Sequence, residues 1–122
     1  MQIQINTGHN IEGGKMLSAH ISEVVEDTLR HHSEQLTRVE VHLADENGPD
    51  SELNVIRCAM EGRLKRHQPL TVTCEAGSVH QAVDEAAEKL DRLVEHTLGR
   101  LHDEKIHRTD PPILNYPANG NV

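Results

Sequence analysis

Residues 56–94 read IRCAMEGRLKRHQPLTVTCEAGSVHQAVDEAAEKLDRLV, and the spacing of the apolar residues changes partway along this stretch. Apolar and polar residues alternate on both sides of a basic turn at Lys65 and Arg66, which is typical of two strands with one buried face. After Ser78 the apolar residues recur every three or four positions, as in a helix. Ser78 and Gln81 match a capping box, in which both side chains satisfy free backbone groups of the first helical turn. We therefore expect two strands followed by a helix of about 25 residues.

The preceding part of the chain shows the same two patterns. Isoleucines alternate with polar residues over 2–6, and apolar residues recur at helical spacing over about 15–32. A second alternating run covers 37–45 and ends in a polar cluster that contains glycine and proline, which is typical of a turn. The order β-α-β-β-β-α predicts an α+β two-layer sandwich, in which a four-stranded sheet has one polar face and carries both helices on the other.

Length and composition fit one small domain. The chain has 122 residues, and with only 1% aromatic residues its core must be aliphatic. We expect the domain to span 1–108 and a disordered tail, rich in proline and asparagine, to span 109–122. Cys58 and Cys74 lie in apolar stretches and are expected to be reduced core residues. The sequence contains neither a membrane-spanning run nor a signal peptide, which predicts a cytoplasmic protein.

The net charge of −8 argues against indiscriminate binding to nucleic acid, which requires basic surface. The charge is uneven, however, because residues 57–74 contain four basic residues and one acidic residue. Two interpretations of this block remain open: a solvated turn, or a small patch that contacts phosphate. The residues of the second interpretation are Arg63, Lys65 and Arg66, assigned to the turn between the third and fourth strands.

The charges of the last helix are also separated around its axis. An acidic row, predicted to project outward, comprises Asp84, Glu88, Asp91 and Glu95. A basic stripe along one flank of the apolar face comprises Lys89, Arg92, His96 and Arg100. Ordinary salt-bridge rows are one interpretation; the other is contact with the phosphate backbone of folded RNA, which needs charge and spacing but no base recognition. Base-stacking modules are excluded, because the only aromatic residue is Tyr116 in the expected tail.

The sequence contains no motif for catalysis or cofactor binding. Its ten histidines form no HxxxH or HExxH pair, so we expect no metal site. A nucleophile elbow and a P-loop are also absent. We therefore expect no catalytic residues, no enzyme activity, no cofactor and no small-molecule substrate.

Several segments resemble the ribosome hibernation-promoting factors, also called ribosome-associated inhibitors or sigma-54 modulation proteins. The resemblance covers about residues 1–105 and is carried by MQIQI at the N-terminus, by RVEV at 38–41, and by the alanine, lysine and arginine spacing of 82–92. It implies a fold like the double-stranded RNA-binding domain. It also implies a translation inhibitor that docks on the small ribosomal subunit in stationary phase or stress, with 16S rRNA of the 30S subunit or 70S ribosome as its partner. Lys89 and Arg92 match the basic helix of the family, which implies that they contact ribosomal RNA.

The resemblance is to short members of this family, and we expect a monomer without a membrane partner. A second function class stays open. Residues 1–56 contain three basic and ten acidic residues, which favours an acidic protein-interaction module on the same fold with weak or no RNA binding.

Overall fold

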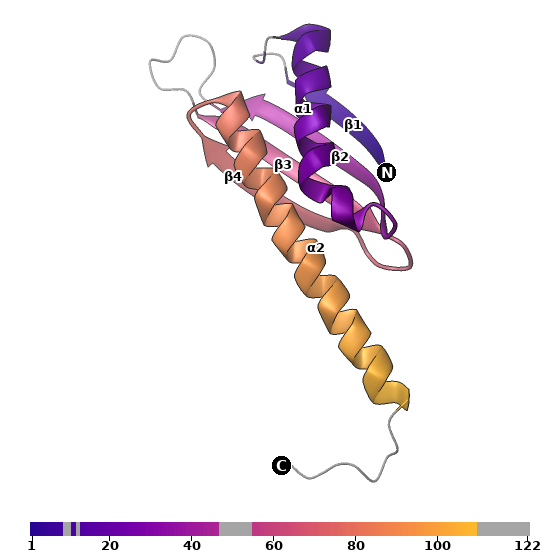
Figure 1. The fold of residues 1–122 in the computed structure, drawn as a ribbon. Helices are drawn as coiled ribbons and strands as arrows, with labels where there is room; N and C mark the ends of the chain where they lie inside the picture. Colours follow the sequence, from indigo (N-terminus) through magenta and orange to yellow (C-terminus); the bar gives the residue numbers. More distant parts are fainter. Residues whose placement is uncertain (9–10, 12, 47–54, 110–122) are drawn as a thin grey trace.

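The computed structural model describes residues 1–8, 11, 13–46 and 55–109. It contains a four-stranded sheet with both helices on one face, as Figure 1 shows. The described elements are β1 (Gln2–Thr7), α1 (Gly14–Leu29), the 3-10 turn η1 (Arg30–His32), β2 (Leu36–Asp45), β3 (Ile56–Leu64), β4 (Leu70–Ala76) and α2 (Val79–Thr109). The predicted order and fold class are confirmed.

The sheet has the order β1-β2-β3-β4, so β1 and β4 are its edges. β1 pairs parallel with β2, because α1 carries the chain back across the sheet between them. β2, β3 and β4 pair antiparallel, since each connection reverses the chain. Because α2 follows β4 in the chain, the long helix starts next to this edge strand.

Glycine determines where α1 begins. Gly13 has a φ of 144°, which side chains rarely adopt, and a Cβ there would lie 2.6 Å from the Cβ of Leu17. The helix then buries Ile21, Val25 and Leu29 against the sheet. Instead of one helix to residue 32, the chain tightens into η1 after Leu29, and this short turn buries His32.

The α2 helix has one of the two hydrogen bonds of the predicted capping box, and it is longer than predicted. The backbone N–H of Gln81 donates to the Ser78 hydroxyl at 3.2 Å. The helix has 31 residues and continues through the exposed Gly99. An exposed helical glycine costs only about 1 kcal/mol relative to alanine, which is too little to end a helix that packs elsewhere along its length. Figure 1 shows the C-terminal part of α2 projecting beyond the sheet.

The core lies between the sheet and the two helices. Its buried hydrophobic residues come from α1, β2, β3, β4 and α2, and the isoleucines of β1, Ile3 and Ile5, pack against it while half-buried. At Gly62 of β3 a Cβ would lie 3.0 Å from Leu36 Cδ1 and 3.4 Å from Leu90 Cδ1, so the absence of a side chain lets α2 pack close to the sheet. The opposite face of the sheet is polar, as the alternation predicts.

The two cysteines are free and buried, as expected from the sequence. No helix in the described part of the chain is long and apolar enough to cross a membrane. The predicted tail falls almost entirely on 110–122, outside the described residues, and the predicted domain boundary stays a prediction.

Candidate nucleic-acid interface

The basic stripe of α2 begins at Lys89, beside β4. Lys89 contacts the edge strand directly, because its Nζ donates to the Thr73 carbonyl oxygen at 3.1 Å. Its ammonium group therefore already has a partner within the protein. Lys89 also lines an open hollow of about 560 Å³ between α2 and the sheet edge, together with Glu46, Arg57, Thr73, Cys74, Glu75 and Glu85. Three carboxylates and two cations share this hollow, so it is not a predominantly basic cleft.

The rest of the stripe is exposed and makes fewer contacts within the protein than Lys89 does. Arg92, His96 and Arg100 are all exposed, and none of them makes an ion pair with another described residue. His96 and Arg100 line a second hollow of about 330 Å³ with Gly99 and Asp103. Exposed side chains of a projecting helix that make no internal ion pair can reach a phosphate backbone without first breaking internal contacts.

The second predicted patch divides between two elements. Arg63 belongs to β3 rather than to the turn, and its guanidinium lies 3.5 Å from Glu61 and 3.8 Å from Glu40. Lys65 and Arg66 do lie on the turn and are exposed. The turn closes when the His67 backbone N–H donates to the Leu64 carbonyl oxygen at 3.4 Å.

Arg66 adopts an unusual backbone conformation in this turn. Its φ is 59°, a left-handed value that glycine adopts more easily than any other residue. A basic side chain is thus held at a position where its backbone is strained. Strained backbone positions of this kind cluster at functional sites.

The predicted site residues do not form one surface. Gly62 and Leu64 of β3 point toward the helices, so Arg63 between them points to the opposite face of the sheet. The α2 stripe lies on the helix side. The structure therefore separates Arg63 from the stripe.

The polar face of the sheet is a network of paired charges. The Glu40 carboxylate lies 3.6 Å from Arg38 Nε, 3.8 Å from Arg63 and 3.9 Å from His42 Nε2. Arg38 also donates to the side-chain oxygen of Gln4 on β1. Because Glu40 lies beside both guanidiniums and Glu61 also lies beside Arg63, much of the positive charge of these two arginines is neutralised.

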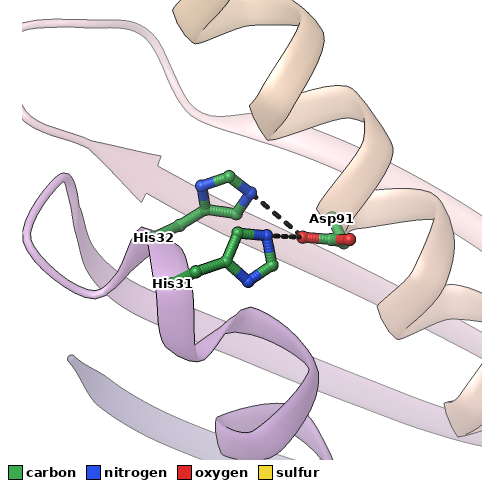
Figure 2. Close-up of side chains that lie close together, drawn as sticks. All are labelled: His31, His32 and Asp91. Atoms are coloured by element: carbon green, nitrogen blue, oxygen red, sulfur yellow. Dashed lines mark ion pairs between the residues drawn. The ribbon is translucent and has the colours of Figure 1, made fainter.

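The structure also brings together a cluster that sequence reasoning missed. His31 and His32 of η1 both face Asp91 of α2 (Figure 2). The predicted acidic row is therefore wrong at Asp91, whose side chain is 24% exposed and directed toward η1. Residues on two elements far apart in the chain leave no spacing signal, so only the packing of η1 against α2 reveals them.

The fold is an α+β domain in which a long helix carries one exposed basic stripe. The model of the family "Sigma 54 modulation protein / S30EA ribosomal protein" matches residues 4–102, and the chain belongs to this family. Members of this family are ribosome-associated hibernation or modulation factors. The match runs from within β1 through β4 and most of α2, so it includes every residue of both predicted contacts.

Solved structures with the same fold include two at low sequence identity. The N-terminal domain of Protein Y from Thermus thermophilus has a TM-score of 0.64 and 18% identity, with 80% of this chain and 99% of that chain covered. A ribosomal subunit interface protein from Coxiella burnetii has a TM-score of 0.59 and 16% identity, with 81% and 99% covered. Among curated proteins, no sequence matches this chain.

Proposed function

We propose that this protein binds the small ribosomal subunit and inhibits translation in stationary phase or stress, acting by occupancy and not by catalysis. The match of the family model over residues 4–102 is the observation that carries the proposal. The partner is 16S rRNA in the 30S subunit or the 70S ribosome, and the protein acts as a monomer in the cytoplasm, where ribosomes are. The similar fold of the Coxiella burnetii ribosomal subunit interface protein supports a ribosomal partner.

The exposed part of the α2 stripe is the proposed main contact. Arg92, His96 and Arg100 are exposed and without ion pairs among the described residues, so phosphate oxygens can approach them at little internal cost. Lys89 contributes less to phosphate binding, because its ammonium group already donates a hydrogen bond to the Thr73 carbonyl oxygen. This contact recognises shape and charge and does not select a base sequence.

Lys65 and Arg66 form a proposed secondary contact. Both side chains are exposed and without an ion pair among the described residues, and the strained backbone of Arg66 holds a cation at the tip of the turn. Arg63 belongs to this contact only if phosphate displaces its pairing with Glu40 and Glu61. We expect this contact to add affinity without being essential.

Sedimentation through sucrose gradients at several salt concentrations tests the proposal. The protein should travel with the 30S and 70S fractions at low salt and move to the top as salt rises. The double variant Arg92→Gln/Arg100→Gln should remain at the top at a salt concentration where the wild type sediments. The control Arg30→Gln/Arg57→Gln removes two arginines that pair with Asp27 and Glu46, so it changes the net charge equally and should sediment like the wild type.

A second candidate function is favoured by the paired charges of the polar sheet face. An acidic protein-interaction module needs no free cations, and on this face Glu40 and Glu61 pair with the arginines. The same gradients separate the two functions. Protein that stays at the top even at low salt contradicts ribosome binding and supports the interaction module.

A further inference from the structure

Three potential metal ligands meet where η1 packs against α2. His31 Nε2 lies 3.1 Å from Asp91 Oδ1, and His32 Nε2 lies 3.0 Å from the same oxygen. The three donor atoms all lie within 4.8 Å of one another. Figure 2 shows both imidazole rings turned toward the carboxylate, which comes from the neighbouring helix.

Two of these atoms are buried without a hydrogen bond. His32 is more than nine-tenths buried, with 8% of its side chain exposed. Its Nε2 and the Oδ1 of Asp91 have no hydrogen-bond partner, although 3.0 Å separates them, because their geometry is not that of a hydrogen bond. A buried polar atom left without a partner costs about 1–3 kcal/mol. A ligand that binds both His32 Nε2 and Asp91 Oδ1 would remove this cost.

We propose that His31, His32 and Asp91 bind a divalent transition-metal ion, with Zn²⁺ as the ion tested. Zinc bonds imidazole nitrogen and carboxylate oxygen at about 2.0–2.2 Å, which places neighbouring donors of a tetrahedral site roughly 3.3 Å apart. The two nitrogen–oxygen distances here, 3.0 and 3.1 Å, are close to that spacing. Mg²⁺ and Ca²⁺ prefer oxygen ligands and are disfavoured by two imidazoles.

The position of the site determines which fourth ligand the metal takes and how the metal affects the stability of the fold. His31 is 58% exposed, so the fourth coordination position opens to solvent and is available to water. The ion would join η1, which follows α1, to the middle of α2. Because only the folded chain brings the three ligands together, bound metal stabilises the fold. The site does not depend on the proposed ribosome binding, and its test uses no ribosomes.

The main alternative is a simple ion pair between protonated imidazoles and Asp91. That arrangement also holds the three groups together, but it excludes metal because a ligating nitrogen must be deprotonated. A further alternative is weak metal binding at any of the ten histidines. Both alternatives predict that metal affinity does not depend on Asp91.

Isothermal titration with Zn²⁺, and the visible absorption of bound Co²⁺, measure binding by the full chain. We expect one equivalent of the metal to bind tightly, and the Tm to rise with Zn²⁺ but not with the same concentration of Mg²⁺. His31→Gln and Asp91→Asn should each weaken this binding by about tenfold or more and abolish the Tm shift. Both variants spare the buried ring of His32, whose loss could prevent folding.

His20 and His80 provide the matched control. Their rings, on α1 and α2, lie 4.7 Å apart in an edge-to-face contact that is not part of the three-residue cluster. His20→Gln/His80→Gln removes two histidines and should leave the tight equivalent intact. Equal zinc affinity in the wild type and the Asp91→Asn variant would overturn the proposal, as would the absence of any zinc-induced rise in Tm.

Discussion

Lys89 of α2 and Thr73 of β4 are joined by a hydrogen bond of 3.1 Å from the lysine Nζ to the threonine carbonyl oxygen. β4 is an edge of the sheet, so its outward backbone groups have no neighbouring strand to pair with. The lysine satisfies one of them and places a charge beside the edge. A residue assigned to RNA contact from the sequence thus has a structural role as well.

Replacing Lys89 with glutamine should lower the free energy of unfolding by about 1 kcal/mol, the typical contribution of one such hydrogen bond. Urea unfolding monitored by circular dichroism measures the change. Arg92→Gln removes the same charge one turn further along α2, where no hydrogen bond or ion pair with a described residue is lost, and should leave stability unchanged. Equal destabilisation by both variants would show that the Lys89–Thr73 hydrogen bond adds nothing to the free energy of unfolding.

Arg66→Gly should stabilise the domain, by about 1 kcal/mol or less. Glycine relieves the cost of the left-handed backbone at φ 59°, and its extra freedom in the unfolded chain offsets part of that gain. Lys65→Gly is the matched control, since it removes the same charge from the same turn at a residue without a positive φ, and it should destabilise. Thermal unfolding of both variants checks the sign.

The same variant also tests the secondary contact. If Arg66 contacts phosphate, Arg66→Gly reduces the salt dependence of 30S binding by roughly one unit of the logarithmic slope, even though the protein is more stable. A slope identical to that of the wild type would mean that Arg66 does not contact phosphate and that the basic turn is only a solvated connection.

Sequence periodicity was sufficient for the fold because each element carries its own pattern. Alternation predicted β2 and β3, and Ser78 with Gln81 predicted the start of α2. The site was predicted less completely, because it depends on how elements pack. Nothing local indicates that Arg63 pairs with Glu40 on β2, or that Asp91 turns toward His32 instead of outward. The first contact follows from the register of β2 and β3, and the second from the packing of η1 against α2.

Cys58 should make folding stability fall at high pH. Burial, together with the nearby Cys74, raises the pKa of its thiol to about 12 from 9.0. The folded state therefore keeps this proton while the unfolded chain loses it. The stabilising contribution is complete below pH 9.0 and is lost progressively as the pH rises toward 12.

Denaturant unfolding at a series of pH values above neutrality measures this loss. Cys58→Ala should show a shallower decline, since alanine has no proton to release. Cys58 should also react slowly with a thiol reagent in the native protein and quickly after unfolding. A wild-type stability profile that matches that of Cys58→Ala would contradict the raised pKa.

Neutralising Glu40 should increase affinity for RNA. Its carboxylate lies 3.6 Å from Arg38 Nε and 3.8 Å from Arg63, so Glu40→Gln releases two guanidiniums from an attractive charge while keeping the shape of the side chain. Each close pair is worth on the order of 1 kcal/mol in water, so we expect RNA affinity at low salt to rise about fivefold. The gain should vanish at high salt, where exposed charges are screened.

Glu23→Gln separates this local effect from the change in net charge. Glu23 is exposed on α1, away from the polar sheet face, and the substitution changes the net charge by the same amount. Filter binding of 16S rRNA to both variants over a range of salt concentrations makes the comparison. An equal increase in the two variants would mean that overall charge alone limits binding. A larger increase with Glu40→Gln would mean that pairing to Glu40 restrains the arginines of the sheet face, and that the acidic residues of this chain weaken RNA contact on that face.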